Sequence, residues 1–374
     1  LPIYQDGAAQ NDSDLRSMDY RIVLEEVKKL LPGLNLHPED AQPLLDEIVQ
    51  RSGLLLSIDG GERYQFVHLT LQEFFAARQL RERPNELIDR FAKNPSRWRE
   101  VVMLSCGLST DSTELIRAVY AKSPLIGFEC LSDARKVDEQ IVSEILGHFK
   151  ALLGQPGPDR DAIAQTFGTA AADYQRPRGG EVFNFLKEEL QGNNEACMLA
   201  AATALSYTNL PGAADLLASV QADDQQRKIT PLLVRMGDLA VPALKRRAAL
   251  GNPNALDGLQ AIGTPLAGEA LAALLGDNVS VTVAREAAWR LGSLLSSPAV
   301  EESLREFKLT HKLPEAERYL WVFKPFEASE ASPLRRIVGR VAYLIATDEK
   351  PDRPTAPPLD PRIGIPLSIE WLKT

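Results

Sequence analysis

The most constraining feature of the sequence is a segment in which the apolar spacing changes at His68. Before it, Tyr64, Phe66 and His68 alternate as residues on one face of an extended strand do. After it, Thr70 and Glu73 have the spacing of a capping box, which starts a helix. The apolar residues that follow at helical spacing are Leu71, Phe74 and Phe75. The pattern predicts a short strand that delivers an imidazole to the start of a helix.

The residues upstream predict a hairpin preceded by helices. An apolar strand is expected from Leu54 to Ile58, and Asp59-Gly60-Gly61 is a tight-turn signal. One amphipathic helix is expected from Ile22 to Leu31, and a second from about Pro38 to Arg51, ended by Gly53. Helices followed by a β-hairpin are the order of elements in a winged helix.

The run 45–55, followed by 66–77, resembles the winged-helix segment of NACHT-type signalling NTPases. These belong to the STAND class, which includes animal NOD-like receptors and their bacterial relatives. The likeness covers about residues 1–108, because 98–101 and 104–108 also look like the helices that follow in that family.

The resemblance implies a role for His68, which in such proteins contacts the β-phosphate of bound ADP and holds the closed, inactive state. An imidazole suits this role because it can donate a hydrogen bond to phosphate and titrates near neutral pH. The alternative is a structural histidine whose ring makes its hydrogen bond to a backbone carbonyl or caps the helix. The resemblance further implies that ATP or ADP is held by a NACHT module N-terminal to Leu1. Glu73 is expected to be a cap, and the residues expected in the core are Phe66, Phe74 and Phe75.

Several chemistries are not supported by the sequence. It contains no G-x-x-x-x-G-K-[ST] loop and no Gly-Lys pair, so the chain is not expected to be an enzyme by itself. No apolar run reaches the ~18 residues of a membrane span, and no secretory signal opens the chain. The three cysteines lie far apart and are expected to be reduced in a cytoplasmic protein. No metal-ligand spacing joins the histidines, which are His37, His68, His148 and His311.

DNA binding by the winged helix, as in a transcription regulator, is an alternative that charge disfavours. The helix expected to enter a groove, 39–52, carries four acidic residues against Arg51. The wing offers only Arg63. Phosphates would be repelled from this face, and the net charge of the whole chain is −9.

Residues from about 195 onward show a loose repeat. Residues 236–244 recur as 262–271, and the marker glycines Gly237, Gly263 and Gly292 are 26 and 29 residues apart. This recurrence resembles short HEAT repeats, whose helical hairpins stack into a solenoid. We therefore expect a mostly α fold: a winged-helix domain with a β-hairpin, followed by a HEAT-like solenoid. The expected domains are a winged helix at 1–80, a helical linker at 81–195, repeats at 196–348 and a proline-rich extended tail at 349–374.

Helices dominate the expected structure after residue 108. Breaks are expected at 154–158 and 176–180, which are rich in glycine and proline. The expected helices span 114–121, 137–153, 182–190, 196–207, 213–220, 229–236, 240–249, 266–275, 281–295, 313–327 and 334–347.

Basic clusters in the repeats are expected to be solvated helix faces or part of a recognition groove for a protein or nucleic acid. These residues are Lys245, Arg246, Arg247, Arg335, Arg336 and Arg340. Nearby aromatic residues, expected mainly in the core, are Trp289, Tyr319, Trp321 and Phe323.

Together these features predict the regulatory and ligand-sensing portion of a NACHT-type signalling ATPase. Its bacterial relatives imply a role in defence against phage, with the winged helix holding the off state and the repeats sensing a ligand. The expected partners are an N-terminal NACHT module, a protein or nucleic-acid ligand, and further copies on activation. The alternative is a non-enzymatic HEAT-like scaffold with the winged helix as a structural cap.

Overall fold

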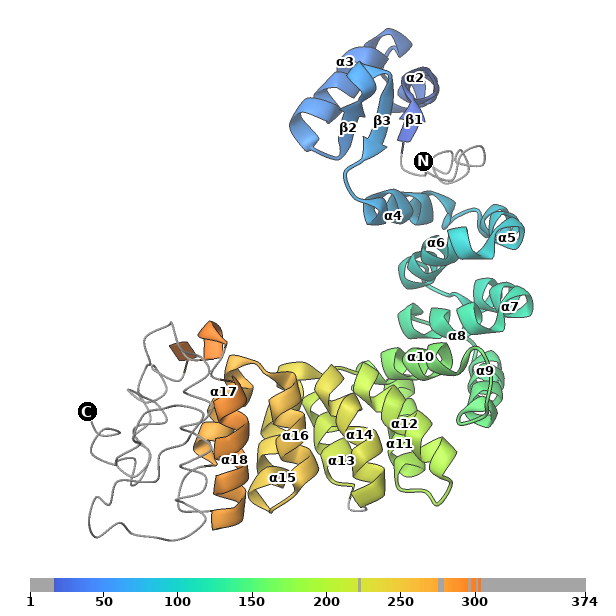
Figure 1. Ribbon diagram of the computed structural model, residues 1–374. Helices are drawn as coiled ribbons and strands as arrows, with labels where there is room; N and C mark the ends of the chain where they lie inside the picture. The colour runs from blue at the N-terminus through green and yellow to red at the C-terminus, as the bar shows by residue number, and fades with distance from the viewer. Residues whose placement is uncertain (1–16, 221–222, 275–278, 295–296, 301, 304–374) are drawn as a thin grey trace. The chain divides into compact units, whose positions relative to one another are not determined.

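The computed structural model describes residues 17–303, with gaps at 221–222, 275–278, 295–296 and 301. These residues form two compact units that divide between Leu152 and Leu153 (Figure 1). Unit 1 contains a small β-sheet followed by helices, and the described part of unit 2 is built from helices. The fold is therefore mostly α, a winged helix followed by a helical solenoid, as predicted. The division falls inside the region 81–195, which itself consists of packed helices.

The winged helix begins with a strand that the sequence did not predict. This strand, β1, pairs antiparallel with β3, and β3 pairs antiparallel with β2, so the sheet order is β1-β3-β2. In this register Met18 lies opposite Tyr64, and Leu55 lies opposite Phe66. The elements are β1 (Ser17–Asp19), α2 (Tyr20–Leu30), α3 (Ala41–Glu47), β2 (Leu55–Ile58) and β3 (Arg63–Phe66).

Local signals explain where these elements begin and end. The Asp19 carboxylate accepts a hydrogen bond from the Arg21 amide at 2.8 Å, which caps α2. The helix expected over 38–51 contains a short 3₁₀ turn, α3 and a π-helical turn at Ile48–Ser52, and ends at Gly53 with φ +62°. The predicted hairpin is confirmed, and Gly60 at φ +70° lies in its turn.

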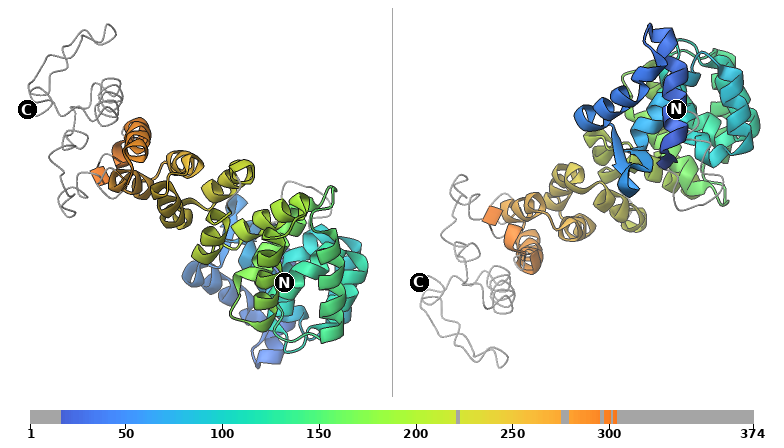
Figure 2. Two further views of the ribbon diagram at one scale, coloured as in Figure 1. Left: turned by 90° about the horizontal axis from the view of Figure 1, so that it is seen from below. Right: turned by 90° about the horizontal axis from the view of Figure 1, so that it is seen from above.

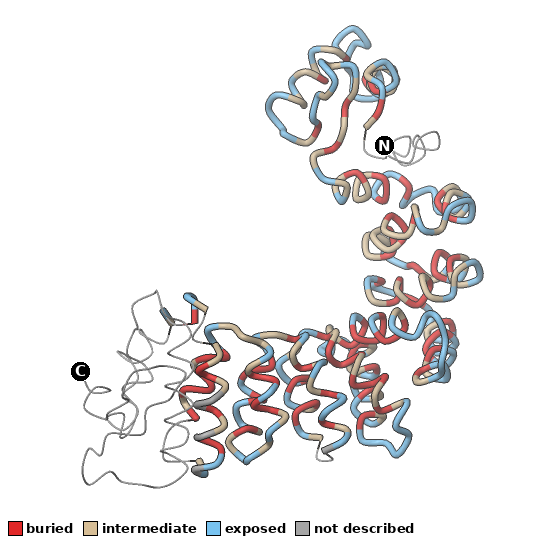
Figure 3. The backbone as a smooth tube through the Cα atoms, in the orientation of Figure 1, coloured by how far each residue is buried: buried red, intermediate tan, exposed pale blue. Residues whose placement is uncertain are grey.

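One apolar cluster holds the winged helix together and includes residues of the helix that follows it. Its partly buried members Leu71 and Phe75 belong to α4 (Leu69–Leu80). The Phe66 and Phe75 ring centroids are 6.2 Å apart. The buried members are Met18, Val23, Leu45, Leu55, Tyr64 and Phe66. Figure 3 shows buried residues concentrated where neighbouring elements face one another.

The rest of unit 1 consists of paired helices. Helices α4, α6 and α8 pack against one another in one row, while α5, α7 and α9 form a second row. Gly127 permits the contact between α7 and α8, because a methyl group there would lie 2.6 Å from Cα of Tyr120. The remaining elements are α5 (Pro84–Lys93), α6 (Pro95–Leu108), α7 (Thr113–Lys122), α8 (Pro124–Asp133) and α9 (Glu139–Leu152).

Unit 2 is also built from paired helices, which stack side by side in a solenoid (Figures 1 and 2). Helices α10, α12, α14, α16 and α18 form one row, and α13, α15 and α17 form another. The elements are α10 (Arg160–Ala172), α11 (Pro177–Leu190), α12 (Glu195–Tyr207), α13 (Pro211–Ala218), α14 (Asp223–Arg235), α15 (Val241–Ala249), α16 (Pro253–Ile262), α17 (Pro265–Ala273) and α18 (Val281–Leu294).

The recurrence in the sequence corresponds to equivalent turns. Gly237 follows α14 with φ +59°, and Gly263 follows α16 with φ +66°. Both use the left-handed region that glycine adopts without strain. Gly292, in contrast, lies inside α18. The third marker glycine therefore does not mark the same turn.

The two expected breaks have different outcomes. The break at 154–158 is confirmed, since it separates α9 from α10 and Gly154 has φ +83°. The break at 176–180 is wrong, because α11 begins at Pro177 and includes the glycines. Gly179 is needed there, since a methyl group would lie 2.1 Å from the Asp173 carbonyl oxygen. Glycine is required at position 179 by close packing against Asp173 and not by a turn of the chain.

Some sequence expectations lie outside the described residues or their side chains. They include the helices at 313–327 and 334–347, the tail at 349–374, the basic residues from Arg335 to Arg340, and the aromatic residues Tyr319, Trp321 and Phe323. The side chain of Trp289 is also outside the description. Their assignments stay predictions.

Candidate functional site

His68 lies at the junction between β3 and α4, as the sequence predicted. Its backbone is still extended, with φ −127° and ψ 134°, and its carbonyl accepts a hydrogen bond from the Leu71 amide at 3.1 Å. Its side chain is exposed and makes no capping hydrogen bond. The buried face of β3 consists of Tyr64 and Phe66, and the alternation stops there because the strand ends at Phe66. The imidazole is therefore open to a partner.

The predicted capping box is wrong. His68 occupies the N-cap position, so Thr70 lies inside the first turn of α4 and is exposed. Strand β3 ends at Phe66, and the helix starts at Leu69, two residues before the start that a cap at Thr70 would give. The first turn of α4 contains no acidic side chain. Its amides and the positive end of the helix dipole therefore lie beside the exposed imidazole.

Helix α4 fixes the position of His68 from two sides. Leu71 and Phe75 pack against the winged-helix core, and Phe74 contacts the Phe75 ring at a centroid distance of 5.7 Å. The same helix packs against α6. Its fully buried residues include Ala76, Ala77 and Leu80. The imidazole thus sits on an element that belongs to both the winged helix and the helical pairs.

Gly53, where the helical segment after α3 ends, lies near His68 because the chain pairs with the hairpin there. The amide of Val67 donates to the carbonyl of Leu54 at 3.1 Å, which places Gly53 and Leu54 beside the residues that lead into α4. Gly53 is exposed, and a methyl group on it would meet no atom within 4 Å. This side of the hairpin is open.

Glu73 is not a cap and instead faces other carboxylates. Burial, followed by repulsion from Glu100 of α6, raises the pKa of Glu73. Burial and the same Glu100 raise the pKa of Asp133, at the end of α8. Glu100 itself is paired with Arg99, which also donates to Glu129 at 2.7 Å. Ionising Glu73 and Asp133 in the row α4-α6-α8 therefore costs more free energy than ionising an isolated carboxyl group.

The charge on α3 disfavours nucleic-acid recognition by the winged helix. Arg51, the single cation expected there, pairs with Glu47 at 2.8 Å. Asp46 accepts from the Gln42 amide group at 2.8 Å. No unpaired positive charge on the described α3 and its π-helical turn is therefore directed at phosphates.

The basic cluster at 245–247 contacts the preceding hairpin. Arg246 pairs with Asp215 of α13, and Arg247 donates to the Val220 carbonyl at 3.5 Å. Lys245 is exposed. The sequence signal for these contacts was the separation of acidic and basic residues by about one repeat, which was not recognised. The two arginines bind within the solenoid, although Arg246 remains exposed, as Lys245 is.

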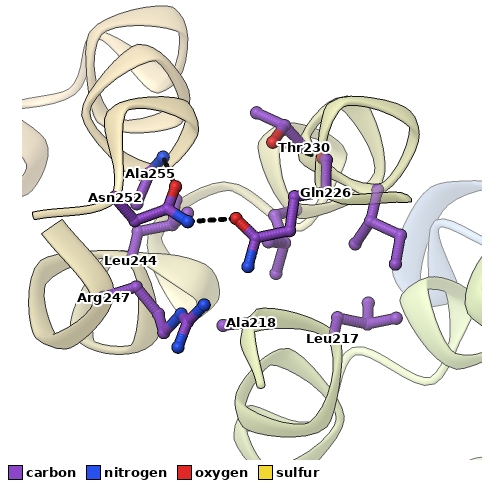
Figure 4. A pocket seen from close by; sticks show the side chains of 10 residues that line it. Leu217, Ala218, Gln226, Thr230, Leu244, Arg247, Asn252 and Ala255 are labelled. Atoms are coloured by element: carbon purple, nitrogen blue, oxygen red, sulfur yellow. Dashed lines mark hydrogen bonds between the residues drawn. The ribbon is translucent and has the colours of Figure 1, made fainter. Parts of the chain in front are cut away.

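The cavity shown in Figure 4 lies among α13, α14, α15 and α16. Its volume is about 10 Å³, which is enough for about one water molecule and too small for a nucleotide. The Asn252 side-chain amide donates to the Gln226 side-chain oxygen at its edge. Residues lining it include Leu217, Ile229, Leu233, Leu244 and Arg247.

Metal and thiol chemistry find little support within the described parts of the chain. In residues 17–303, apart from the gaps, no group of three or more His, Cys, Asp and Glu side chains could hold a metal ion. Cys106 and Cys130 are buried, and a mutual hydrogen bond followed by burial raises the pKa of Cys130. A raised pKa disfavours the reactive thiolate. None of the described helices has the length and apolar character to cross a bilayer.

Comparison with known families identifies one segment. Residues 26–80 match the family described as a winged helix-turn-helix domain C-terminal to NACHT. The matched segment runs from α2 to the last residue of α4 and includes His68. The predicted resemblance is therefore confirmed for the winged helix. No curated protein matches the chain.

Proposed function

We propose that this chain is the regulatory and ligand-sensing portion of a NACHT-type signalling ATPase. The observation that carries the proposal is the exposed imidazole of His68, at the start of α4, inside the segment that matches the winged helix C-terminal to NACHT. A NACHT module on the same polypeptide would hold ADP or ATP, and this chain would supply one contact to it.

The chemistry at the start of α4 suits a phosphate group. An imidazole donates a hydrogen bond to a phosphate oxygen, and the free amides of a helix start favour an anion. Exposure of His68 leaves the group available to a neighbouring module. Contact with the β-phosphate of ADP would stabilise the inactive state, and loss of this contact would release it.

The solenoid suits the second part of the proposal, the reception of a signal. Stacked helical pairs present a broad surface on which a protein or nucleic-acid ligand could bind. Binding would shift the switch only if the ligand prefers the active arrangement. Defence against phage, with assembly of several copies on activation, is the biological role implied by bacterial relatives of this class.

Nucleotide retention by the polypeptide that carries both the NACHT module and this chain tests the proposal. We expect His68→Ala to accelerate ADP release by about tenfold or more, because a hydrogen bond to a charged group contributes about 1.5–3 kcal/mol. The matched control is His37→Ala, since His37 is also exposed but lies outside the β3–α4 junction. Circular dichroism would verify that both variants are folded.

Equal ADP release from the wild type and both variants would contradict the proposal. It would favour the alternative, a HEAT-like interaction scaffold in which the winged helix only caps the array of helices. Faster release from His68→Ala together with spontaneous assembly would support the switch.

A further inference from the structure

Basic residues of the hairpin α14–α15 reach back to the hairpin α12–α13. Lys228 pairs with Glu195, and Arg246 pairs with Asp215. Half or more of each of these side chains remains exposed to solvent. We call the contact between these two hairpins the charged junction.

A third cation, Arg235 at the end of α14, strengthens the same contact. Its guanidinium donates to the Thr203 carbonyl at 3.1 Å and to the Ser206 hydroxyl. It also lies 3.7 Å from the centroid of the Tyr207 ring. Such a cation–π contact at an exposed site is weakly stabilising.

The interior of the charged junction is incompletely packed. The small cavity of Figure 4 lies at its edge and is lined by residues of α13, α14 and α15 and by the start of α16. The Nε atom of Arg247 is buried and finds no hydrogen-bond partner among the described residues. Leaving such a buried donor unsatisfied destabilises the folded state. Movement that admits water to this donor would therefore recover part of that cost.

Helix α14 is itself weakened in its middle. Pro231 lies inside it and has no amide hydrogen to donate to the Arg227 carbonyl. Proline in a helix interior is a common origin of bends. The helix that carries Lys228 and Arg235 therefore lacks one of the backbone hydrogen bonds that resist bending.

The contact on the other side of α12 is built differently. Gly168 of α10 lies so close to α12 that a methyl group there would be 2.4 Å from the Ala204 carbonyl oxygen. Fully or nearly fully buried residues on the two helices include Ala164, Phe167, Ala171, Ala201, Ala204 and Leu205. We call the contact between α10 and α12 the apolar junction.

We propose that the charged junction is a salt-sensitive hinge within unit 2. Exposed ion pairs each contribute little stability and are screened by salt, whereas close apolar packing is not screened. The hinge would let the hairpins on its two sides rotate and so change the curvature of the repeat surface. The inference concerns the solenoid and does not depend on nucleotide contact by His68.

Spin-label distance distributions in the full chain test the hinge. One pair of labels, at Ala196→Cys and Lys245→Cys, spans the charged junction; the control pair, at Thr169→Cys and Ala196→Cys, spans the apolar junction. All three positions are exposed, and Cys197→Ser removes the partly exposed native thiol. Raising the salt from low concentration to 1 M should broaden the first distribution and leave the second unchanged. Equal behaviour of the two pairs would overturn the proposal.

Charge reversal provides a second test. Asp215→Arg should broaden the charged-junction distribution at low salt, because it places a cation opposite Arg246. Adding Arg246→Asp should restore the narrow distribution, since the pair is regenerated with opposite polarity. If the double variant stays as broad as the single one while its helical signal is native, these charges do not hold the junction and the hinge is wrong.

Discussion

The apolar junction and the charged junction hold the same helix, α12, from opposite sides by different forces. On one side, glycine and alanine bring α10 and α12 into contact with no room for another methyl group. On the other, partly exposed lysine and arginine side chains connect α14 and α15 to α12 and α13. The difference shows that neighbouring junctions in this solenoid are held by different kinds of contact.

The largest expected effect comes from filling the apolar junction. Gly168→Ala should lower the free energy of unfolding of unit 2 by about 1–3 kcal/mol, because the new methyl group meets the backbone of α12. Chemical denaturation measures this, and the loss should be the same at low and high salt. Gly212→Ala is the matched control, since a methyl group there meets nothing within 4 Å. Equal losses for both glycines would show that the junction is looser than described.

A smaller effect should follow from removing the cap of α12. The Asn194 side-chain oxygen accepts hydrogen bonds from the amides of Ala196 and Cys197 at 3.0 and 3.3 Å. Asn194→Ala should therefore lower the free energy of unfolding by about 1 kcal/mol. Because α12 belongs to both junctions, the spin-label distance distributions across the apolar junction and across the charged junction should broaden to the same extent. A response confined to one junction would mean that the cap serves that junction alone.

The ion pair between Glu195 and Lys228 should contribute less. A double-mutant cycle with Glu195→Gln and Lys228→Gln should give a coupling energy below about 1 kcal/mol at low salt, because both side chains are half exposed. The coupling should vanish at 1 M salt, where the Debye length is about 3 Å. A coupling energy that survives high salt would mean that this pair is shielded from solvent. The charged junction would then be as insensitive to salt as the apolar junction.

The smallest expected effect extends the comparison to the row α4-α6-α8 of unit 1, where carboxylates face one another. The pKa of Glu73 is raised above its ordinary value of 4.5 by burial and by Glu100. A carboxyl with a raised folded pKa destabilises the fold when ionised, so this cost is present at neutral pH and disappears as the pH falls below the unfolded value. Glu73→Gln should therefore raise the free energy of unfolding at pH 7 by a few tenths of a kcal/mol.

Denaturation across pH measures this effect, and the advantage of the Glu73→Gln variant should vanish near pH 4. Asp111 offers the opposite case, since hydrogen bonds from Thr113 and the Lys136 ammonium hold its pKa well below the ordinary value of 3.8. The stabilisation that ionised Asp111 provides to the fold is present above pH 3.8 and is lost as the pH falls below that value. Asp111→Asn should therefore destabilise unit 1 at pH 7. A Glu73→Gln variant less stable than wild type at pH 7 would contradict the assigned repulsion.

Much of the secondary structure could be predicted from local signals. Gly53 ends the second winged-helix segment, and Asp59-Gly60-Gly61 turns the hairpin, because these backbone positions require left-handed φ values. Proline at the start of helices was harder to interpret. The segment 176–180, with its proline and glycines, predicted a break, yet α11 begins at Pro177 and Gly179 permits its close contact with Asp173. Composition alone does not distinguish these two uses of glycine.

The candidate site was predicted in part. Its position at the junction of strand and helix followed from the change of period around His68. The start of the helix was misplaced by two residues, because the capping-box spacing of Thr70 and Glu73 occurred by chance inside α4. Neither the exposure of the imidazole nor the repulsion between Glu73 and Glu100 could be read from spacing. Both depend on which elements pack beside α4.

Sequence by itself determined the order of elements, the turns and the repeating helical pairs, because backbone preferences and apolar periodicity act over a few residues. Tertiary structure decided that His68 stays open, that Arg235 and Arg246 reach back to the preceding hairpin, and that α12 has one tight and one charged neighbour. The physical reason is distance along the chain. Residues about thirty positions apart meet only after helices stack, and their contact depends on the angle and spacing of that stack.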